Sequence, residues 1–262
     1  MFDGFNRRIH YLRVSVTDEC NLRCVYCRPE AGEDRSRRGR MLSFEEISGF
    51  VRVAAGMGVD KVRLTGGEPL LREGLPELVG MIAYIKDLAM TTNGVLLARF
   101  ASDLRRAGLA RVNVSLDAVD PESYARITRG GDLRDVLAGI DAALEANLRP
   151  VKLNCVVERS PSEPDARRVG EFAAKKGLEA RFIRRMDPAR GEFWPVALSG
   201  GGDCPRCNRL RLTSDGLLRP CLLSDLAFDV RELGAREAIR RAVEAKPRSG
   251  AACACKLYAI GG

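Results

Sequence analysis

Three cysteines near the N-terminus share the spacing Cys20-x-x-x-Cys24-x-x-Cys27. They follow residues 11–16, a run rich in β-branched side chains, so we expect them in a loop at the carboxyl end of a strand. Iron–sulfur clusters are held by thiolates, and a cube of four irons needs four ligands. Three cysteines in one loop would leave one iron open to a small molecule. A zinc site would normally require four protein ligands, and His10 is the only histidine of the chain.

A second set of three cysteines, Cys204, Cys207 and Cys221, lies toward the C-terminus. Polar and apolar residues alternate after Cys207, which predicts a strand on which Arg209 and Arg211 point to the same side. Two guanidinium groups beside an open iron suit a polyphosphate ligand. The second set therefore suggests another metal centre that is combined with an anion site.

Two further cysteines, Cys253 and Cys255, come just before the C-terminus, and Cys155 stands alone. Either Cys253 or Cys255 could complete a zinc site with the second set, or could give an iron cluster its fourth thiolate.

The first residues lack the apolar segment of a secretory signal, so we expect a cytoplasmic protein. In a reducing compartment, clustered cysteines are more often metal ligands than disulfides.

Strand-like and helix-like stretches alternate over the first 186 residues, and Ser43 and Glu46 have the spacing of a capping box. We expect strands at 11–16, 61–65, 87–91, 111–115, 151–157 and 179–184, and helices at 43–56, 74–83, 97–107, 132–145 and 165–176. Six such repeats predict parallel strands that are joined by right-handed crossovers. The fold class is therefore α/β, as a partial (β/α)6 barrel, with a doubly wound sheet as the alternative.

Polar residues follow the expected strands, at the edge of the barrel where chemistry is usual. Gly66 and Gly67 come after the second strand and would let the backbone approach a ligand closely, while Glu68 offers an acceptor for an ammonium group. The residues at the other strands are Thr91 and Asn93 after the third, Ser115 after the fourth, Lys152 on the fifth and Arg181 on the sixth. Their shared placement predicts a single site.

The pattern changes after Met186, where prolines and glycines mark a connector. A hairpin is expected from residues 208–213 and 217–223 around Asp215-Gly216, with a helix at 235–244. We therefore divide the chain into a barrel domain, 1–186, and a C-terminal auxiliary cluster domain, 187–262.

The net charge of +8 and the pI of about 9.2 suit an anionic partner, such as nucleic acid, a membrane surface or a phosphorylated small molecule. The basic run at 35–40 lacks the interleaved aromatic residues that stack on bases, and no apolar run is long enough to span a membrane. A single histidine also argues against Ser-His-Asp hydrolases. We expect a small-molecule substrate and neither nucleic acid nor a membrane as partner.

The first cysteine motif and the GGEP segment resemble the radical S-adenosylmethionine (SAM) superfamily, whose members bind SAM to the open iron of a four-iron cluster. The chain as a whole is similar to one family in it, the MoaA-type GTP 3′,8-cyclases of molybdenum cofactor biosynthesis. The matching segments are LRVSVTDECNLRCVYC, VRLTGGEPLLR, TTNG, RVNVSLD, PVKLNCVV, RFI, CPRCNRLRLTSDGLLRPCL and the terminal IGG.

This resemblance implies two 4Fe-4S clusters, SAM as a cofactor and GTP as the substrate. It implies that Cys20, Cys24 and Cys27 bind the first cluster and that Cys204, Cys207 and Cys221 bind the second, whose open iron would take the guanine. The implied SAM contacts are Tyr26, Gly66, Gly67, Glu68, Asn93, Ser115 and Met186. The implied GTP contacts are Arg13, Arg63, Thr91, Lys152, Arg181, Arg209 and Arg211. Arg209, Arg211, Gly261 and Gly262 are the implied catalytic residues.

The resemblance also implies an electron donor, either a reductase or a ferredoxin or flavodoxin, for a monomer or homodimer. Three features depart from the family pattern: a short connector, Arg184 and Arg185 in place of a glutamate, and the pair Cys253 and Cys255. They leave two other functions open. One is a radical SAM dehydrogenase or peptide-modifying maturase with a fully ligated auxiliary cluster, and the other is a binding module without activity.

Overall fold

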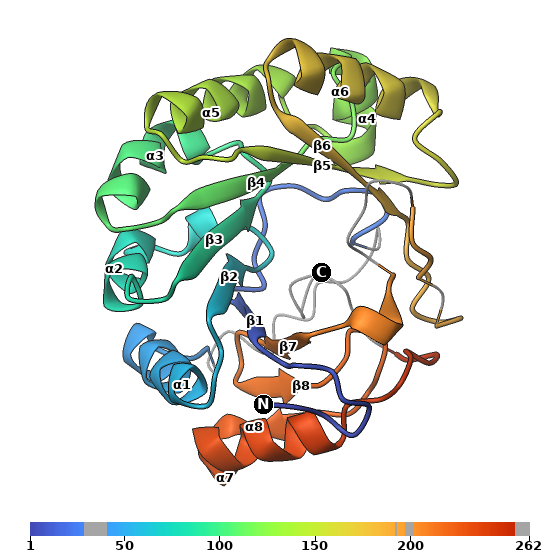
Figure 1. Ribbon diagram of the computed structural model, residues 1–262. Helices are drawn as coiled ribbons and strands as arrows, with labels where there is room; N and C mark the ends of the chain where they lie inside the picture. Colours follow the sequence, from blue (N-terminus) through green and yellow to red (C-terminus); the bar gives the residue numbers. More distant parts are fainter. Residues whose placement is uncertain (29–40, 192, 197–201, 255–262) are drawn as a thin grey trace.

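The computed structural model describes residues 1–28, 41–191, 193–196 and 202–254. Six of its strands are β1 (Tyr11–Ser15), β2 (Lys61–Thr65), β3 (Asp87–Thr92), β4 (Arg111–Ser115), β5 (Lys152–Val157) and β6 (Glu179–Arg184). Each pairs in parallel with the next, so the order in space follows the order in the chain without a reversal. A doubly wound sheet would reverse its order at the first strand. The predicted partial barrel is therefore confirmed (Figure 1).

Helices cover the outside of the curved sheet (Figure 1). They are α1 (Phe44–Gly56), α2 (Leu75–Met81), α3 (Leu97–Arg106), α4 (Pro121–Thr128), α5 (Leu133–Glu145) and α6 (Pro164–Lys175). The capping box of α1 is confirmed, because Ser43 and Glu46 exchange side-chain to backbone hydrogen bonds. Helix α4 was not expected, although its signal is visible in the sequence: Asp120 caps it and Pro121 opens its first turn.

The C-terminal part continues the same sheet. Strand β7 (Arg209–Leu212) pairs in parallel with β1, and β8 (Leu217–Arg219) and β9 (Phe228–Asp229) follow in antiparallel pairing. Helices α7 (Val230–Leu233) and α8 (Ala235–Glu244) complete the described part. The predicted hairpin is confirmed. The domain boundary after Met186 stays a prediction, and strands from both sides of it belong to one sheet.

Alternation along each strand separates the core from the interior of the barrel. On β4, Val112 and Val114 are fully buried in the core, while Asn113 and Ser115 line the cavity inside the barrel. Strand β2 has the same arrangement, with Val62 and Leu64 in the core and Lys61, Arg63 and Thr65 lining the cavity. Because side chains alternate between the two faces, these two strands each direct one set of mainly polar side chains into the same cavity.

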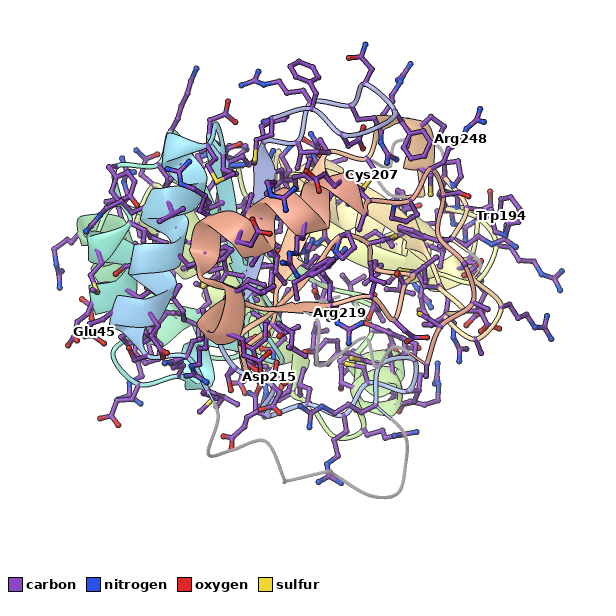
Figure 2. The ribbon with its side chains drawn as sticks, turned by 90° about the horizontal axis from the view of Figure 1, so that it is seen from below. Glu45, Trp194, Cys207, Asp215, Arg219 and Arg248 are labelled. Atoms are coloured by element: carbon purple, nitrogen blue, oxygen red, sulfur yellow. The ribbon has the colours of Figure 1, made fainter. Side chains whose placement is uncertain are left out.

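Arg7 ties the N-terminal segment to the C-terminal part. Its Nε donates to Asp3 Oδ2 at 2.6 Å, and its guanidinium also donates to the carbonyl oxygens of Cys204, Pro247 and Arg248. In Figure 2, Arg248 and Glu45 lie on opposite sides of the molecule. Burial would raise the pKa of Asp3, but hydrogen bonds from Arg7 and Phe5 outweigh it, and the pKa is lowered.

Asp3→Asn should lower the free energy of unfolding at pH 7 by about 2 kcal/mol, because a buried charge-assisted hydrogen bond is weakened. The lowered pKa means that Asp3 stabilises the fold above its ordinary value of 3.8, and this contribution is lost as the pH falls through the folded value. Thermal unfolding of both proteins from pH 7 down to 3 would measure this. The control is Asp103→Asn, which removes an exposed pair with Arg106 and should change stability by less than about 0.5 kcal/mol. A difference between Asp3→Asn and wild type that grows toward acid pH would contradict the prediction.

Candidate active site

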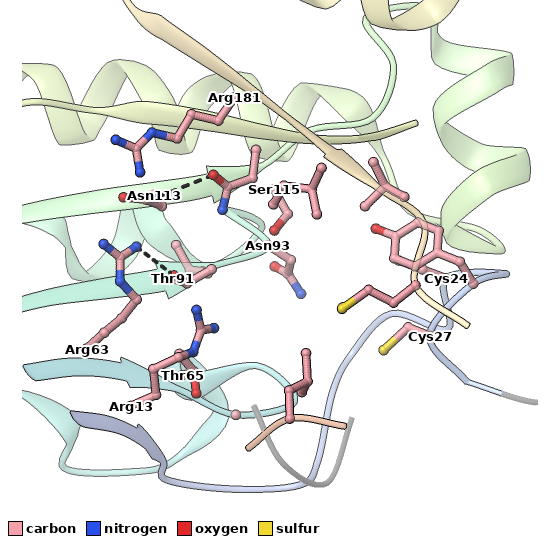
Figure 3. A pocket seen from close by; sticks show the side chains of 18 of the residues that line it. Arg13, Cys24, Cys27, Arg63, Thr65, Thr91, Asn93, Asn113, Ser115 and Arg181 are labelled. Carbon is pink, nitrogen blue, oxygen red and sulfur yellow. Dashed lines mark hydrogen bonds between the residues drawn. The ribbon is translucent and has the colours of Figure 1, made fainter. Parts of the chain in front are cut away.

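A cavity of about 420 Å³ lies inside the barrel, at the carboxyl ends of the strands (Figure 3). It is large enough for small-molecule ligands. The expected site residues that line it are Arg13, Cys20, Cys24, Tyr26, Cys27, Arg63, Gly66, Gly67, Thr91, Asn93, Ser115, Arg181, Met186, Arg209 and Arg211. The structure thus brings together residues that the sequence spreads over almost 200 positions.

The first cysteine loop is fixed by its backbone. The Cys27 amide donates to the Cys24 carbonyl at 2.9 Å, which closes a turn around the two thiols. The amides of Arg23 and Val25 donate to the carbonyls of Thr128 and Ile127, at the end of α4. Helix α4, which was not expected, therefore helps to anchor this loop.

The three thiols of the loop line the cavity together and can serve as iron ligands. Burial, followed by the nearby Asp117, raises the pKa of Cys24 to about 12, and burial and Cys20 raise that of Cys27 to about 11. Without a metal these groups stay protonated, whereas bound iron would stabilise the thiolates. Among the described residues, no three His, Cys, Asp or Glu side chains are grouped closely enough to hold a single metal ion.

Gly66 and Gly67 allow the loop after β2 to pack against the cysteine loop. A Cβ at Gly67 would lie 2.1 Å from the Glu19 carbonyl oxygen, and one at Gly66 would lie 2.6 Å from that of Thr17. Backbone atoms cannot yield at such distances, so only glycine fits at either position. In addition, the Gly67 and Glu68 amides donate to the same two carbonyls.

Glu68 is held in place by hydrogen bonds from the protein. Its side chain is fully buried and, within the described part of the chain, does not line the cavity. One carboxyl oxygen accepts from Leu70 N and Thr92 Oγ1, and the other accepts from Asn93 N at 2.7 Å. Burial raises its pKa to about 7 despite these bonds. Glu68 therefore joins the end of β2 to the end of β3, and its expected contact with an ammonium group stays a prediction.

Tyr26 and Asp117 connect the cysteine loop to the opposite strands. Tyr26 Oη donates to Asp117 Oδ2 at 2.6 Å, and the Val156 amide donates to Asp117 Oδ1 at 2.7 Å. Burial raises the pKa of Asp117, and the two hydrogen bonds act against this rise. The hydroxyl of Tyr26 is thus engaged by the protein, so the ring is the part that faces the cavity.

Two rows made of basic residues and Tyr11 cross the floor of the cavity. The strand register places Arg63, Arg13 and Arg211 side by side on β2, β1 and β7, with Lys61, Tyr11 and Arg209 as the row beside them. Burial, followed by the neighbouring Arg211, lowers the pKa of Arg13 to about 9. Burial and then Arg209 lower that of Arg211 to about 10. Like charges in a buried row favour an anion between them.

Lys152 does not join these rows. It forms an ion pair with Glu179 and is absent from the described lining of the cavity. Arg181, which does line the cavity, also donates to Glu179, at 2.7 Å from Nε to Oε1. The neighbouring strand thus supplies a carboxylate to Lys152 that the sequence pattern did not reveal, and the expected contact of Lys152 with a ligand stays a prediction.

The second cysteine set lies just beyond the cavity. Asn208 and Leu222, which directly follow Cys207 and Cys221, line it. Burial would raise the pKa of Cys207, but Lys246 and the Arg209 amide outweigh this effect and the pKa is lowered. Lys246 is itself buried and donates to the carbonyls of Arg209 and Pro220. A buried ammonium group beside the thiols fits a cluster that is held by thiolates.

The last residues are only partly covered by the structure. Cys253 is buried and disulfide-bonded, and its Sγ lies 4.0 Å from the Leu222 carbonyl oxygen. Cys255, Gly261 and Gly262 lie outside the described residues, so their expected roles stay predictions.

Some lining residues were not singled out from the sequence. Tyr11, Lys61 and Asn113 all line the cavity. Each is two residues away from an expected site residue on the same strand, and this period of two is the signal that could have identified them.

A Radical SAM superfamily model matches residues 14–172 of the chain. GTP 3′,8-cyclases of several bacteria are similar over nearly the full length. The protein of Thermodesulfovibrio yellowstonii is 39% identical and that of Pelotomaculum thermopropionicum 42%, with 95% and 92% of this chain and 95% and 88% of those proteins covered. The first alignment spans 305 positions, more than the 262 residues of this chain, so that relative has segments that this chain lacks.

Solved structures show the same fold at low sequence identity. Streptococcus suis SuiB bound to S-adenosylmethionine has a TM-score of 0.67 and 13% identity, covering 92% of this chain and 65% of SuiB. Native anSMEcpe with bound AdoMet has a TM-score of 0.63 and 17% identity, covering 95% of this chain and 82% of that one. No helix in the described part of the chain is long and apolar enough to cross a membrane.

Asp117→Ala should weaken the first cysteine loop, because it leaves the Tyr26 hydroxyl and the Val156 amide without their acceptor. We expect a loss of about 2–4 kcal/mol of stability and faster extraction of iron by a chelator. Tyr26→Phe should have a smaller effect, and the double variant should cost less than the sum, because both changes break the same bond. Full additivity, or unchanged iron release, would rule out this anchoring role.

The cysteine loop, the glycines after β2 and the barrel around them agree with the family match and with the relatives. A protein of this superfamily uses SAM and a 4Fe-4S cluster, and Cys20, Cys24 and Cys27 are the thiols whose surroundings fit that cluster. The chain belongs to the radical SAM superfamily and, within it, to the family of the GTP 3′,8-cyclases.

Proposed function

We propose that this enzyme converts GTP to 3′,8-cyclo-7,8-dihydro-GTP, a step of molybdenum cofactor biosynthesis. The observation that carries the proposal is the shared cavity, with three cysteine thiols at one end and the rows of cations at the other. The full-length similarity to proteins named GTP 3′,8-cyclase supports it.

The first cysteine loop would hold a 4Fe-4S cluster, and Gly66, Gly67 and Ser115 would position SAM beside it. When bound, these groups supply a 5′-deoxyadenosyl radical that removes hydrogen from C3′ of the ribose, so that C3′ can bond to C8 of guanine. The protein contributes orientation and the exclusion of water. Met186 and the ring of Tyr26 bring apolar surface to the cavity and serve this exclusion.

The triphosphate would lie against the cation rows. Arg13, Arg63 and Arg211 offer planar donors that can each bind two phosphate oxygens, and a bound anion would relieve their mutual repulsion. Arg63 Nη1 donates to the Thr91 hydroxyl at 3.1 Å, and this bond helps to orient the guanidinium group. These contacts would fix the distance between the reacting ribose and the first cluster.

Cys204, Cys207 and Cys221 would hold a second 4Fe-4S cluster with one open iron for the guanine. Asn208 and Leu222 line the cavity directly beside this cysteine set. A guanine base that extends between them would reach the second cluster. Cleavage of SAM would consume one electron, and conversion of the cyclised radical to the dihydro product would consume a second electron and a proton. We expect these electrons to come from a reductase, or from a ferredoxin or flavodoxin, and we place the reaction in the cytoplasm.

Anaerobically reconstituted full-length protein should convert GTP when it is given SAM and a strong reductant. Mass spectrometry would follow the cyclised product and 5′-deoxyadenosine, which should form in equal amounts. Cys24→Ala should abolish both. Formation of 5′-deoxyadenosine with intact GTP would refute the proposal and favour a dehydrogenase or a peptide-modifying maturase.

In the alternative function, the second cluster has four protein ligands. Cys253 is a candidate for the fourth, because its sulfur lies near Leu222, the residue after Cys221. Cys207→Ala should lose one cluster's iron, whereas Cys253→Ala should keep both clusters, because its sulfur is disulfide-bonded in this structure. Iron analysis and electron paramagnetic resonance of each variant would measure this. Loss of the second cluster in Cys253→Ala would show a closed iron and would exclude guanine binding there.

A further inference from the structure

Asn113 has an unused hydrogen-bond acceptor in the floor of the cavity. It lies in the middle of β4, its side chain lines the cavity, and the residue is only 2% exposed. Its Nδ2 donates to Asn154 Oδ1 at 3.3 Å, whereas its Oδ1 is buried without a partner among the described residues. A buried acceptor without a partner costs free energy, so such a group in a cavity wall indicates a ligand contact.

Within the described part of the chain, neither neighbouring side chain donates to this oxygen. The strand register places Asn113 beside Thr91 on β3 and Lys152 on β5. Thr91 Oγ1 accepts from Arg63, and the ammonium group of Lys152 pairs with Glu179. The acceptor is therefore left for a group that enters the cavity.

The position of Asn113 indicates which part of the substrate it meets. In Figure 3 it lies on the side of Arg63 and Arg181, with Ser115 between it and Cys24. If cations hold the triphosphate and the reaction occurs toward the first cluster, as in the proposed function, the ribose lies between these two ends. The ribose carries neutral hydroxyl donors, which match a neutral carbonyl oxygen better than a phosphate does.

We propose that Asn113 Oδ1 accepts a hydrogen bond from a hydroxyl of the substrate ribose and thereby selects ribonucleotides over deoxyribonucleotides. This inference rests on the proposed function. A site built to bind a hydroxyl rejects the analogue without it, because the buried acceptor then stays unpaired.

Binding of GTP, 2′-deoxyGTP and 3′-deoxyGTP to the reconstituted holoenzyme would test the proposal by anaerobic calorimetry. Wild type should bind GTP about tenfold more tightly than one of the two deoxy nucleotides, which identifies the hydroxyl. Asn113→Leu should bind GTP about tenfold more weakly and should no longer distinguish it from that analogue. Asn113→Ala is the second variant if the leucine does not fit.

Asn154→Leu is the matched control. It removes the protein partner of Asn113 and keeps the acceptor, so the preference for GTP should persist. Equal loss of affinity for all three nucleotides in Asn113→Leu would overturn the proposal. So would a weakened affinity for SAM with unchanged GTP binding, because the hydroxyl would then belong to SAM. Failure of the proposed function would appear differently, as wild type that forms no cyclised product.

Discussion

The parallel pairing of β1 with β7 is the contact on which the architecture of the site depends. It adds the C-terminal strands to a sheet that would otherwise end at β1, and its register sets Arg13 beside Arg211. Without it, the barrel would have the first cysteine loop but only part of the cation rows. The second cysteine set would also lose its place beside the cavity, because Cys207 lies two residues before β7. One ladder of backbone hydrogen bonds thus unites the two halves of the proposed chemistry.

Charge compensation explains why such a site can exist in a stable protein. Arg13 and Arg211 are buried with a neighbour of like charge, an arrangement that normally costs stability. Thiolates, carboxylates and a bound anion are the groups that can offset it, and Glu179 already does so for Lys152 and Arg181. The empty and loaded forms of the protein therefore differ in electrostatic energy, and loading with the cofactors and substrate stabilises the fold.

Motifs that depend on neighbours in the chain could be predicted from the sequence. The six strands, the capping box at Ser43 and the cysteine loop follow from local spacing and from the period of two. The partners of Glu68 and Lys152 could not be predicted, because they lie on other strands and are set by register. Asn113 also escaped notice, since an asparagine inside a strand gains meaning only when its partners are known. Local pattern predicted the elements and the location of the site, whereas pairing across the sheet determined which polar groups are occupied.

The central position of β1 also has a consequence for biosynthesis. This strand is made first, yet one of its two neighbours, β7, begins almost 200 residues later in the chain. During translation, β1 therefore keeps one unpaired edge until the last quarter of the polypeptide has emerged, which makes that edge the part of the nascent chain most in need of protection. Arg7 adds the final link, because it can bind the carbonyls of Pro247 and Arg248 only when almost the whole chain is present.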